Sequence, residues 1–200
     1  MCSDRPASED AIAEDGRRQR SERNRQKIIS AMFELVREGN FDPSVAQVAE
    51  RAGVGLRTVF RHFDEVDSLY QEMTAQMDAR IIPEIQKPLN ATEWPDRVKE
   101  LMARRIRIFE DIMPVKICAG VRRFRSEYLM ERHKRFVSHE TAALALALPQ
   151  EILSNESLMA SFDIVFSFDT WRRLRQDQRY SRAKATEVME TMLDALIAAA

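Results

Sequence analysis

"DPSVAQVAERAGVGLRTVFRHF" occupies residues 42–63 and holds the strongest local signals in the chain. Ser44 is followed three residues later by Gln47, the spacing of a capping box, which predicts a helix beginning at Val45. Small and apolar residues recur on one side of this helix, and Gly53 is expected to end it. The stretch therefore starts with a short amphipathic helix.

A second short helix is predicted at residues 56–62. We expect Gly53 to reverse the chain in the left-handed conformation, which glycine adopts without a Cβ clash, and Gly55 to cap the second helix. Val59 and Phe63 lie four residues apart and are expected to face inward. Two short helices joined by such a turn predict a helix-turn-helix, whose second helix fits the major groove of DNA.

The outward side of the second helix is the predicted DNA-reading surface. An exposed Phe60 is unfavourable in water but suits contact with a thymine methyl or a sugar. The first helix begins at Ser44, and its N-terminus is expected to face phosphate. Arginines on the second helix either bond a guanine or only hold phosphate. The residues predicted to contact DNA are Ser44, Gly55, Leu56, Arg57, Thr58, Phe60, Arg61 and His62.

The segment SVAQVAERAGVGLRTVFRHFDEVDSLY, residues 44–70, resembles the N-terminal DNA-binding domain of TetR-family transcriptional regulators. The resemblance extends over residues 22–81, and SFDTWRRLRQDQRYS, residues 167–181, is similar to the penultimate helix of a subset of the family. It implies a homodimer, an operator of two half-sites, and a C-terminal domain that often binds a small molecule and thereby weakens DNA binding. The matching positions are Ala49, Gly53, Val54, Thr58, Val59, Phe60, His62, Phe63, Leu69 and Tyr70.

The chain departs from the family's pattern at three positions. Phe60 stands where tyrosine is usual, so a phenolic hydrogen bond to phosphate is lost. Val66 stands where the fourth helix often begins with a basic residue, and Gly55 stands where a hydroxyl residue is usual. Each change removes one contact to the DNA backbone and leaves the class unaltered.

Almost all of the remaining sequence favours helix, so we expect an all-α fold of about nine helices. Residues 1–20 are predicted to be a disordered arm, residues 21–82 the TetR-type helix-turn-helix domain with its motif at 44–63, and residues 83–200 a C-terminal ligand-binding and dimerisation domain. Helices are predicted at residues 65–82, 94–112, 121–148, 155–174 and 182–199, with breaks at Pro83 and Pro88, at Pro114 and at Pro149.

The charge of the chain is distributed unevenly. The net charge is −1, but residues 17–62 hold ten lysines and arginines against five acidic residues, +5, which leaves −6 for the rest. A basic segment on an acidic body indicates a polyanion partner, here double-stranded DNA, although an ordinary solvated face explains the asymmetry equally well. The basic run at residues 17–25 either adds electrostatic affinity for DNA or is a solvated arm.

Other classes of protein lack support in the sequence. No phosphate loop, nucleophile motif or carboxylate pair stands out, so neither an enzyme nor a cofactor is expected. His133 and His139 lack metal-ligand spacing, so no metal site is expected. The two cysteines, the absence of a signal peptide and an apolar run of only residues 142–148 favour a cytoplasmic protein without a membrane partner. Cys118 is expected to be a small core residue, with a thiol sensor as the alternative.

The two C-terminal helices carry apolar residues on two sides, which predicts a partner helix on each side. A homodimer interface satisfies this pattern, and burial of both sides within one chain is the alternative. The predicted interface residues are Phe162, Val165, Phe168, Val188 and Met192.

An apolar or aromatic effector is predicted to bind in the C-terminal domain, with a plain hydrophobic core as the alternative. The predicted pocket residues are Met102, Ile106, Phe109, Met113, Phe124, Tyr128 and Phe162. Six arginines are expected to lie outside it, on the surface: Arg104, Arg105, Arg107, Arg122, Arg123 and Arg125.

Together these observations predict a dimeric DNA-binding transcriptional regulator, a repressor released from its operator by a small-molecule effector. One alternative is an architectural DNA-binding protein without an effector. Another is an all-α enzyme or binding protein in which the helix-turn-helix is incidental.

Overall fold

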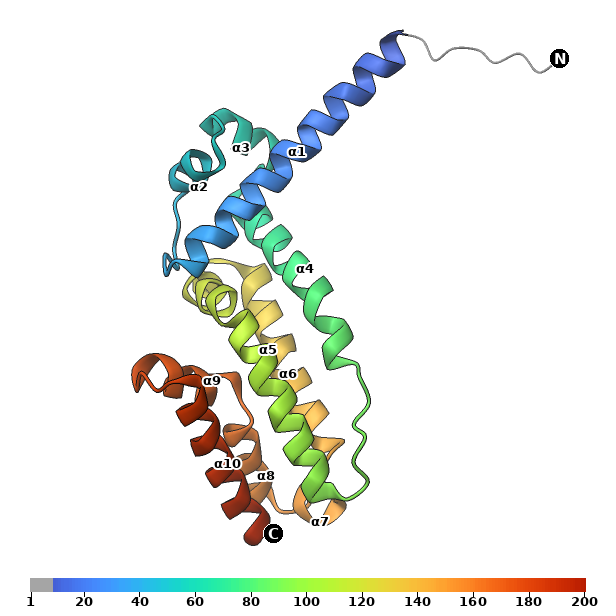
Figure 1. Ribbon diagram of the computed structural model, residues 1–200, viewed down its shortest axis with the longest axis vertical. Coiled ribbons are helices and arrows are strands. Elements are labelled where there is room, and N and C mark those ends of the chain that lie inside the picture. The colour runs from blue at the N-terminus through green and yellow to red at the C-terminus, as the bar shows by residue number, and fades with distance from the viewer. Residues whose placement is uncertain (1–8) are drawn as a thin grey trace, which may run out of the picture. The chain divides into compact units, whose positions relative to one another are not determined.

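The computed structural model describes residues 9–200, and within that range the chain is helical without strands (Figure 1). The all-α fold predicted from the sequence is therefore confirmed. The elements in chain order are α1 (Glu9–Arg37), α2 (Val45–Ala52), α3 (Leu56–His62), α4 (Val66–Ile85), α5 (Trp94–Arg122), the 3-10 helix η1 (Arg123–Arg125), α6 (Glu127–Ala145), α7 (Gln150–Leu153), α8 (Glu156–Val165), α9 (Phe168–Arg172), the π-helical turn η2 (Arg173–Asp177) and α10 (Arg182–Ala198).

The chain divides into two compact units. The first ends at Thr74 and contains α1, α2, α3 and the first turns of α4. The second, Ala75–Ala200, contains the rest of α4 and all later helices. The border between the units and the domain border predicted after residue 82 both fall within α4.

The first unit is built around the second half of α1. Figure 1 shows α2 and α3 beside this part of the helix. Gly39, at φ +94°, ends α1 in a Schellman turn, in which Asn40 N–H donates to the Leu35 carbonyl at 3.0 Å. Each fully buried aliphatic side chain contributes about 1.5–3 kcal/mol. The core of the unit comprises Ile28, Ile29, Met32, Leu35, Val36, Val48, Ala49, Val59, Phe63, Leu69, Tyr70 and Met73.

The first half of α1 differs from the predicted disordered arm. Residues 1–8 of that arm lie outside the described residues, whereas residues 9–20 are helical. The segment lacks an apolar stripe, which is why the sequence indicated disorder, but it is rich in alanine, glutamate, glutamine and arginine, which are strong helix formers. Side-chain pairs four residues apart add support, as in the Gln19 Nε2 donation to Asp15 at 2.8 Å.

Two of the predicted proline breaks are wrong. Helix α4 continues past Pro83 to Ile85, and α5 continues past Pro114 to Arg122. A proline inside a helix loses one backbone hydrogen bond, at a cost of about 3 kcal/mol. Around Pro114 the neighbouring turns are held by the buried side chains of Ile112 and Val115, so tertiary packing overrides the local cost.

Two predicted long helices are each divided at a serine. The predicted helix 121–148 is interrupted, and Ser126 caps α6 by accepting from Leu129 N–H at 3.3 Å. The predicted helix 155–174 is divided at Ser167, which caps α9 by accepting from Thr170 N–H at 3.1 Å. The predicted cap of the last helix is confirmed, since Ser181 accepts from Lys184 N–H at 3.2 Å.

The second unit packs around α5, which contacts α6, α9 and α10, while α8 lies against α10. Its core is aromatic. Phe168 makes edge-to-face contacts with Phe109 at 5.6 Å and Phe136 at 6.4 Å between ring centroids. Trp171 is fully buried and donates its indole N–H to Glu110 at 3.0 Å. Cys118 is also buried in this core, as expected of a small apolar residue.

Candidate nucleic-acid interface

The turn between α2 and α3 has the geometry that the glycine pattern predicted. Gly53 lies in the left-handed region at φ +64°, ψ +36°. Val54 N–H then donates to the Ala49 carbonyl at 3.0 Å, which closes the end of α2. At the start of α2, Ser44 and Gln47 form the predicted capping box, with bonds of 3.2 and 2.9 Å. These contacts are local, so the sequence alone defines the direction of the turn.

Helix α3 begins with Gly55 as its N-cap, in extended conformation at φ −69°, ψ 148°. Thr58 N–H donates to the Gly55 carbonyl at 2.8 Å, and no side chain caps the helix. The predicted cap position is therefore confirmed. A Cβ at Gly55 would lie 4.0 Å from Thr58 Oγ1, so the site has room for a larger residue.

The outer face of α3 is apolar and basic at once. Val59 and Phe63 are buried and anchor the helix, as predicted. On the other side Leu56 and Phe60 are 46% and 47% exposed, and Arg57 and Arg61 are also exposed. Among the side chains of residues 15–200, neither arginine has an ion pair or hydrogen bond, so both guanidinium groups can meet an external anion.

His62 differs from its predicted role on the exposed surface. The side chain is half-buried, and its Nε2 is covered without a hydrogen-bond partner. Burial lowers the pKa of His62, and the nearby charges of Arg61 and Arg25 lower it further, against a smaller opposing effect of Glu22. Only Nε2 is covered in this way, and contact between His62 and DNA stays a prediction. Thr58 is also half-buried.

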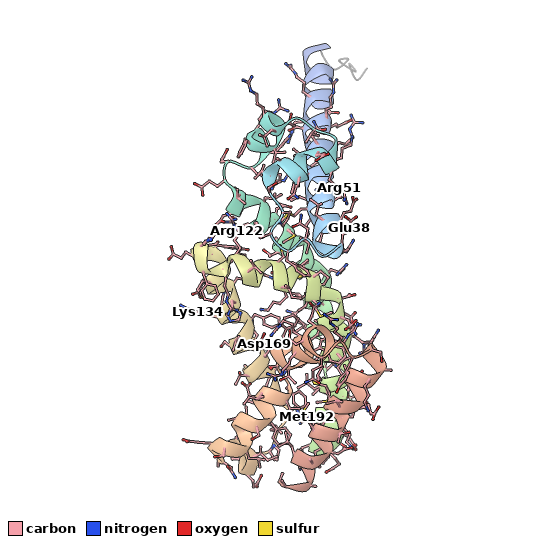
Figure 2. The ribbon with its side chains drawn as sticks, turned by 90° about the vertical axis from the view of Figure 1, so that its left-hand side faces the viewer. Glu38, Arg51, Arg122, Lys134, Asp169 and Met192 are labelled. Atoms are coloured by element: carbon pink, nitrogen blue, oxygen red, sulfur yellow. The ribbon has the colours of Figure 1, made fainter. Side chains whose placement is uncertain are left out.

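Two basic residues near α3 serve the fold. Arg25 of the predicted basic arm forms an ion pair with Glu72 and lies over the Phe63 ring, 5.0 Å from its centroid. Arg51 binds Glu38 through two hydrogen bonds of 2.8 and 2.7 Å, a pair visible in Figure 2. Both arginines are occupied by carboxylates, so they cross-link the helices of the first unit.

The predicted effector residues do not share one environment. Met102, Ile106, Phe109 and Phe162 are buried in the core of the second unit, and Met113 and Tyr128 are half-buried. Phe124 is 73% exposed, so its assignment to a pocket is wrong. The cause is η1, which interrupts the predicted helix and places Phe124 on a surface turn.

Three of the predicted dimer residues are also wrong. Phe162, Val165 and Phe168 are buried within their own chain, where Phe162 packs edge to face on Trp94 and Phe168 on Phe109. Val188 and Met192 of α10 remain half-buried. The exposed apolar residue of this region is Ile164 of α8, at 65%.

Two of the six arginines expected on the surface are buried. Arg104 donates to the carbonyls of Lys87 and Pro88 and thereby holds the segment after α4. Arg105 donates to the carbonyls of Phe166, at 2.8 Å, and Glu140. Both satisfy backbone acceptors that no local pattern in the sequence reveals.

Burial perturbs the charged groups between α5 and α6. It lowers the pKa of Arg105 to about 10 and that of Lys116 to about 8. It raises the pKa of Glu140 to about 7, although the charge of Arg105 and the Phe168 N–H bond oppose this rise. Lys116 is not among the residues predicted from the sequence, yet its position four residues after Ile112 and seven after Phe109 places it on the buried face of α5.

Comparison with known proteins shows which solved structures share this architecture. No family model and no curated protein matches the chain. A transcriptional regulator from Rhodococcus sp. Rha1 has a TM-score of 0.64 and 16% identity, over 88% of this chain and 96% of that chain. A transcriptional regulator from Mesorhizobium loti MAFF303099, assigned provisionally to the TetR family, has a TM-score of 0.57 and 17% identity, over 90% and 98%. The chain shares the fold of these regulators, so the resemblance stated from the sequence is confirmed at the level of the fold.

Among the described residues, no helix combines the length and the apolar composition needed to cross a membrane.

Proposed function

We propose that the chain is a DNA-binding transcriptional regulator that reads double-stranded DNA with α3. The observation that carries the proposal is the outer face of this helix, where Arg57 and Arg61, which pair with none of the described side chains, lie beside exposed Leu56 and Phe60. Arginine reads guanine through two hydrogen bonds, and apolar side chains contact thymine methyl groups. The similarity to solved transcriptional regulators supports the same function.

The test begins by selecting bound sequences from random duplex DNA, followed by gel-shift titration. If Arg57 bonds guanine, Arg57→Ala should weaken the selected site about 5–150-fold, the equivalent of 1–3 kcal/mol, and weaken random DNA much less. Arg61→Ala, if it holds phosphate, should weaken both DNAs and lower the salt slope by about one. The control is Arg173→Ala, an exposed arginine of the second unit that should leave both affinities unchanged. Failure of the wild-type chain to enrich any sequence would refute the proposal.

We further propose that the regulator acts as a homodimer through the outer faces of α8 and α10. Ile164 is exposed, and Val188 and Met192 are half-buried, so these helices present apolar surface that their own unit leaves uncovered. Two copies would present two copies of α3 to half-sites about 34–36 Å apart, or a multiple of that spacing. Equal affinity for a single half-site and for a palindrome would contradict the dimer.

Release of the DNA by a small-molecule effector is the third part of the proposal. Helix α4 supplies residues to both units, so a ligand that shifts its second half would act on the first unit. Asp78 on that half binds Arg132 of α6 through both carboxylate oxygens, and this pair fixes the second half of α4 to α6 within the second unit. An effector must bind the two states with different affinity, and operator DNA must weaken its binding by the same factor. Identical ligand affinities with and without operator would favour the architectural alternative.

A further inference from the structure

Three basic side chains meet between α5 and α6 in the second unit: Lys116 of α5, Arg123 of η1 and His133 of α6, together called the cationic cluster. Arg123 Nη1 lies 3.2 Å from Nδ1 and 3.1 Å from Nε2 of His133. Equal distances to both ring nitrogens place the guanidinium against the ring, where it cannot bond either nitrogen along its lone pair. Arg123 Nε is buried without a hydrogen-bond partner.

The charges of Glu140 and Asp169 attract Lys116 through space, but neither carboxylate forms an ion pair with the cluster among the described residues. Across residues 15–200, whose side chains are described, no carboxylate forms an ion pair with Lys116 or Arg123. The acidic groups nearby are engaged elsewhere. Asp169 pairs with Arg172 at 3.5 Å, and Glu140 accepts the Phe168 N–H at 3.0 Å. Charged donors without a direct carboxylate contact are unfavourable when partly buried, so the cluster favours the arrival of a further negative charge that bonds them.

The ammonium group of Lys116 lies against aromatic rings and not against a carboxylate. Lys116 Nζ lies 3.4 Å from the centroid of Phe136 and 5.9 Å from that of Phe168. The face of an aromatic ring attracts the lysine ammonium group but accepts no hydrogen bond from the N–H groups that point away from the ring. Phe136 is itself half-buried, so the same place offers charge and apolar surface.

We propose that the cationic cluster binds the carboxylate of a small organic acid whose apolar body packs against Phe136. Lys116 and Arg123 supply the charge, and His133 positions Arg123 and adds a donor when it is protonated. Burial lowers the pKa of His133, and the charges of Lys116 and Arg123 lower it further, against an opposing effect of Asp169. A bound carboxylate reverses the balance of charge around the ring and should raise that pKa.

The position of the cluster connects it with the proposed regulation, and its role as an effector site rests on the proposed function. His133 follows Arg132, whose guanidinium binds Asp78 of α4. A ligand that draws His133 and Lys116 together would therefore act on the turn of α6 that holds α4. Carboxylate binding itself does not depend on this connection.

The test uses the full chain and matched pairs of probes: sodium benzoate against benzamide, and sodium phenylacetate against phenylacetamide, at constant ionic strength. Calorimetry should show saturable binding of the carboxylates and at least tenfold weaker binding of the amides. Lys116→Met and Arg123→Met should each weaken carboxylate binding at least tenfold. Lys134→Met is the matched control, because Lys134 is an exposed residue of α6, labelled in Figure 2, and its loss should change nothing.

Several outcomes overturn the proposal: no binding of either carboxylate, equal binding of the amides, or an equal loss in Lys134→Met. NMR titration of His133 gives a second readout, since its pKa should rise with carboxylate in the wild type and stay unchanged in Arg123→Met. Gel shifts on the same samples separate the two proposals. Carboxylate binding without an effect on operator affinity keeps the anion site and removes its effector role, whereas failure to bind DNA refutes the proposed function alone.

Discussion

Replacing Lys116 by methionine should make the protein more stable. The variant keeps a flexible side chain of similar length against Phe136 and removes a charge that burial disfavours. The usual lysine pKa of 10.5 is lowered to about 8, which at about 1.36 kcal/mol per pKa unit corresponds to about 3 kcal/mol. Partial exposure of the side chain and the loss of the ring contact offset part of this, so we expect a net gain of about 1–2 kcal/mol.

The stability difference between Lys116→Met and the wild type should depend on pH. Between pH 8 and 10.5 the unfolded chain binds more protons at this lysine than the folded chain, so wild-type stability rises with pH across that range. The advantage of Lys116→Met should therefore be constant below pH 8 and shrink as the pH rises towards 10.5. In chains of this size, 1–2 kcal/mol corresponds to a Tm increase of about 2–8 °C.

Thermal unfolding followed by circular dichroism at pH 7 and pH 10 measures both effects. Lys134→Met, at an exposed position on α6, should shift stability by no more than about 0.5 kcal/mol at either pH. Two results would refute the reasoning: a Lys116→Met variant less stable than the wild type at pH 7, or a stability difference as large at pH 10 as at pH 7. Either would show that the buried lysine charge does not destabilise the folded protein.

The other expected outcomes concern the backbone and the dimer. Gly53→Ala should cost about 1–2 kcal/mol in urea unfolding, because φ is +64°, whereas Gly120→Ala, inside α5 with open space around it, should gain about 0.5–1 kcal/mol. Ile164→Glu should give monomers by light scattering with an intact fold, whereas Phe168→Glu should unfold the second unit. Gly16→Ala should slow amide exchange in the first turns of α1, and unchanged exchange would argue against a helix there.

The helix-turn-helix could be predicted residue by residue because its signals are local. The capping box spans Ser44 to Gln47, and the turn depends on Gly53. Val59 and Phe63 anchor α3 through a spacing of one helical turn. Each signal acts over a few residues, so no knowledge of distant contacts was needed for α2, the turn or the bounds of α3.

In the second unit, contacts between distant residues decided what local patterns could not. Pro114 lies within α5 because buried side chains on both sides outweigh its lost hydrogen bond. Arg105 is buried because its guanidinium meets the carbonyl of Phe166, 61 residues further along the chain. Sequence by itself determined the all-α class and the two short helices α2 and α3, since periodicity and capping are properties of neighbouring residues. Tertiary structure alone brought Lys116, Arg123 and His133 together. The apolar pattern of a helix shows which face is buried but not which helix packs against it, and the pairing is decided only in the packed core.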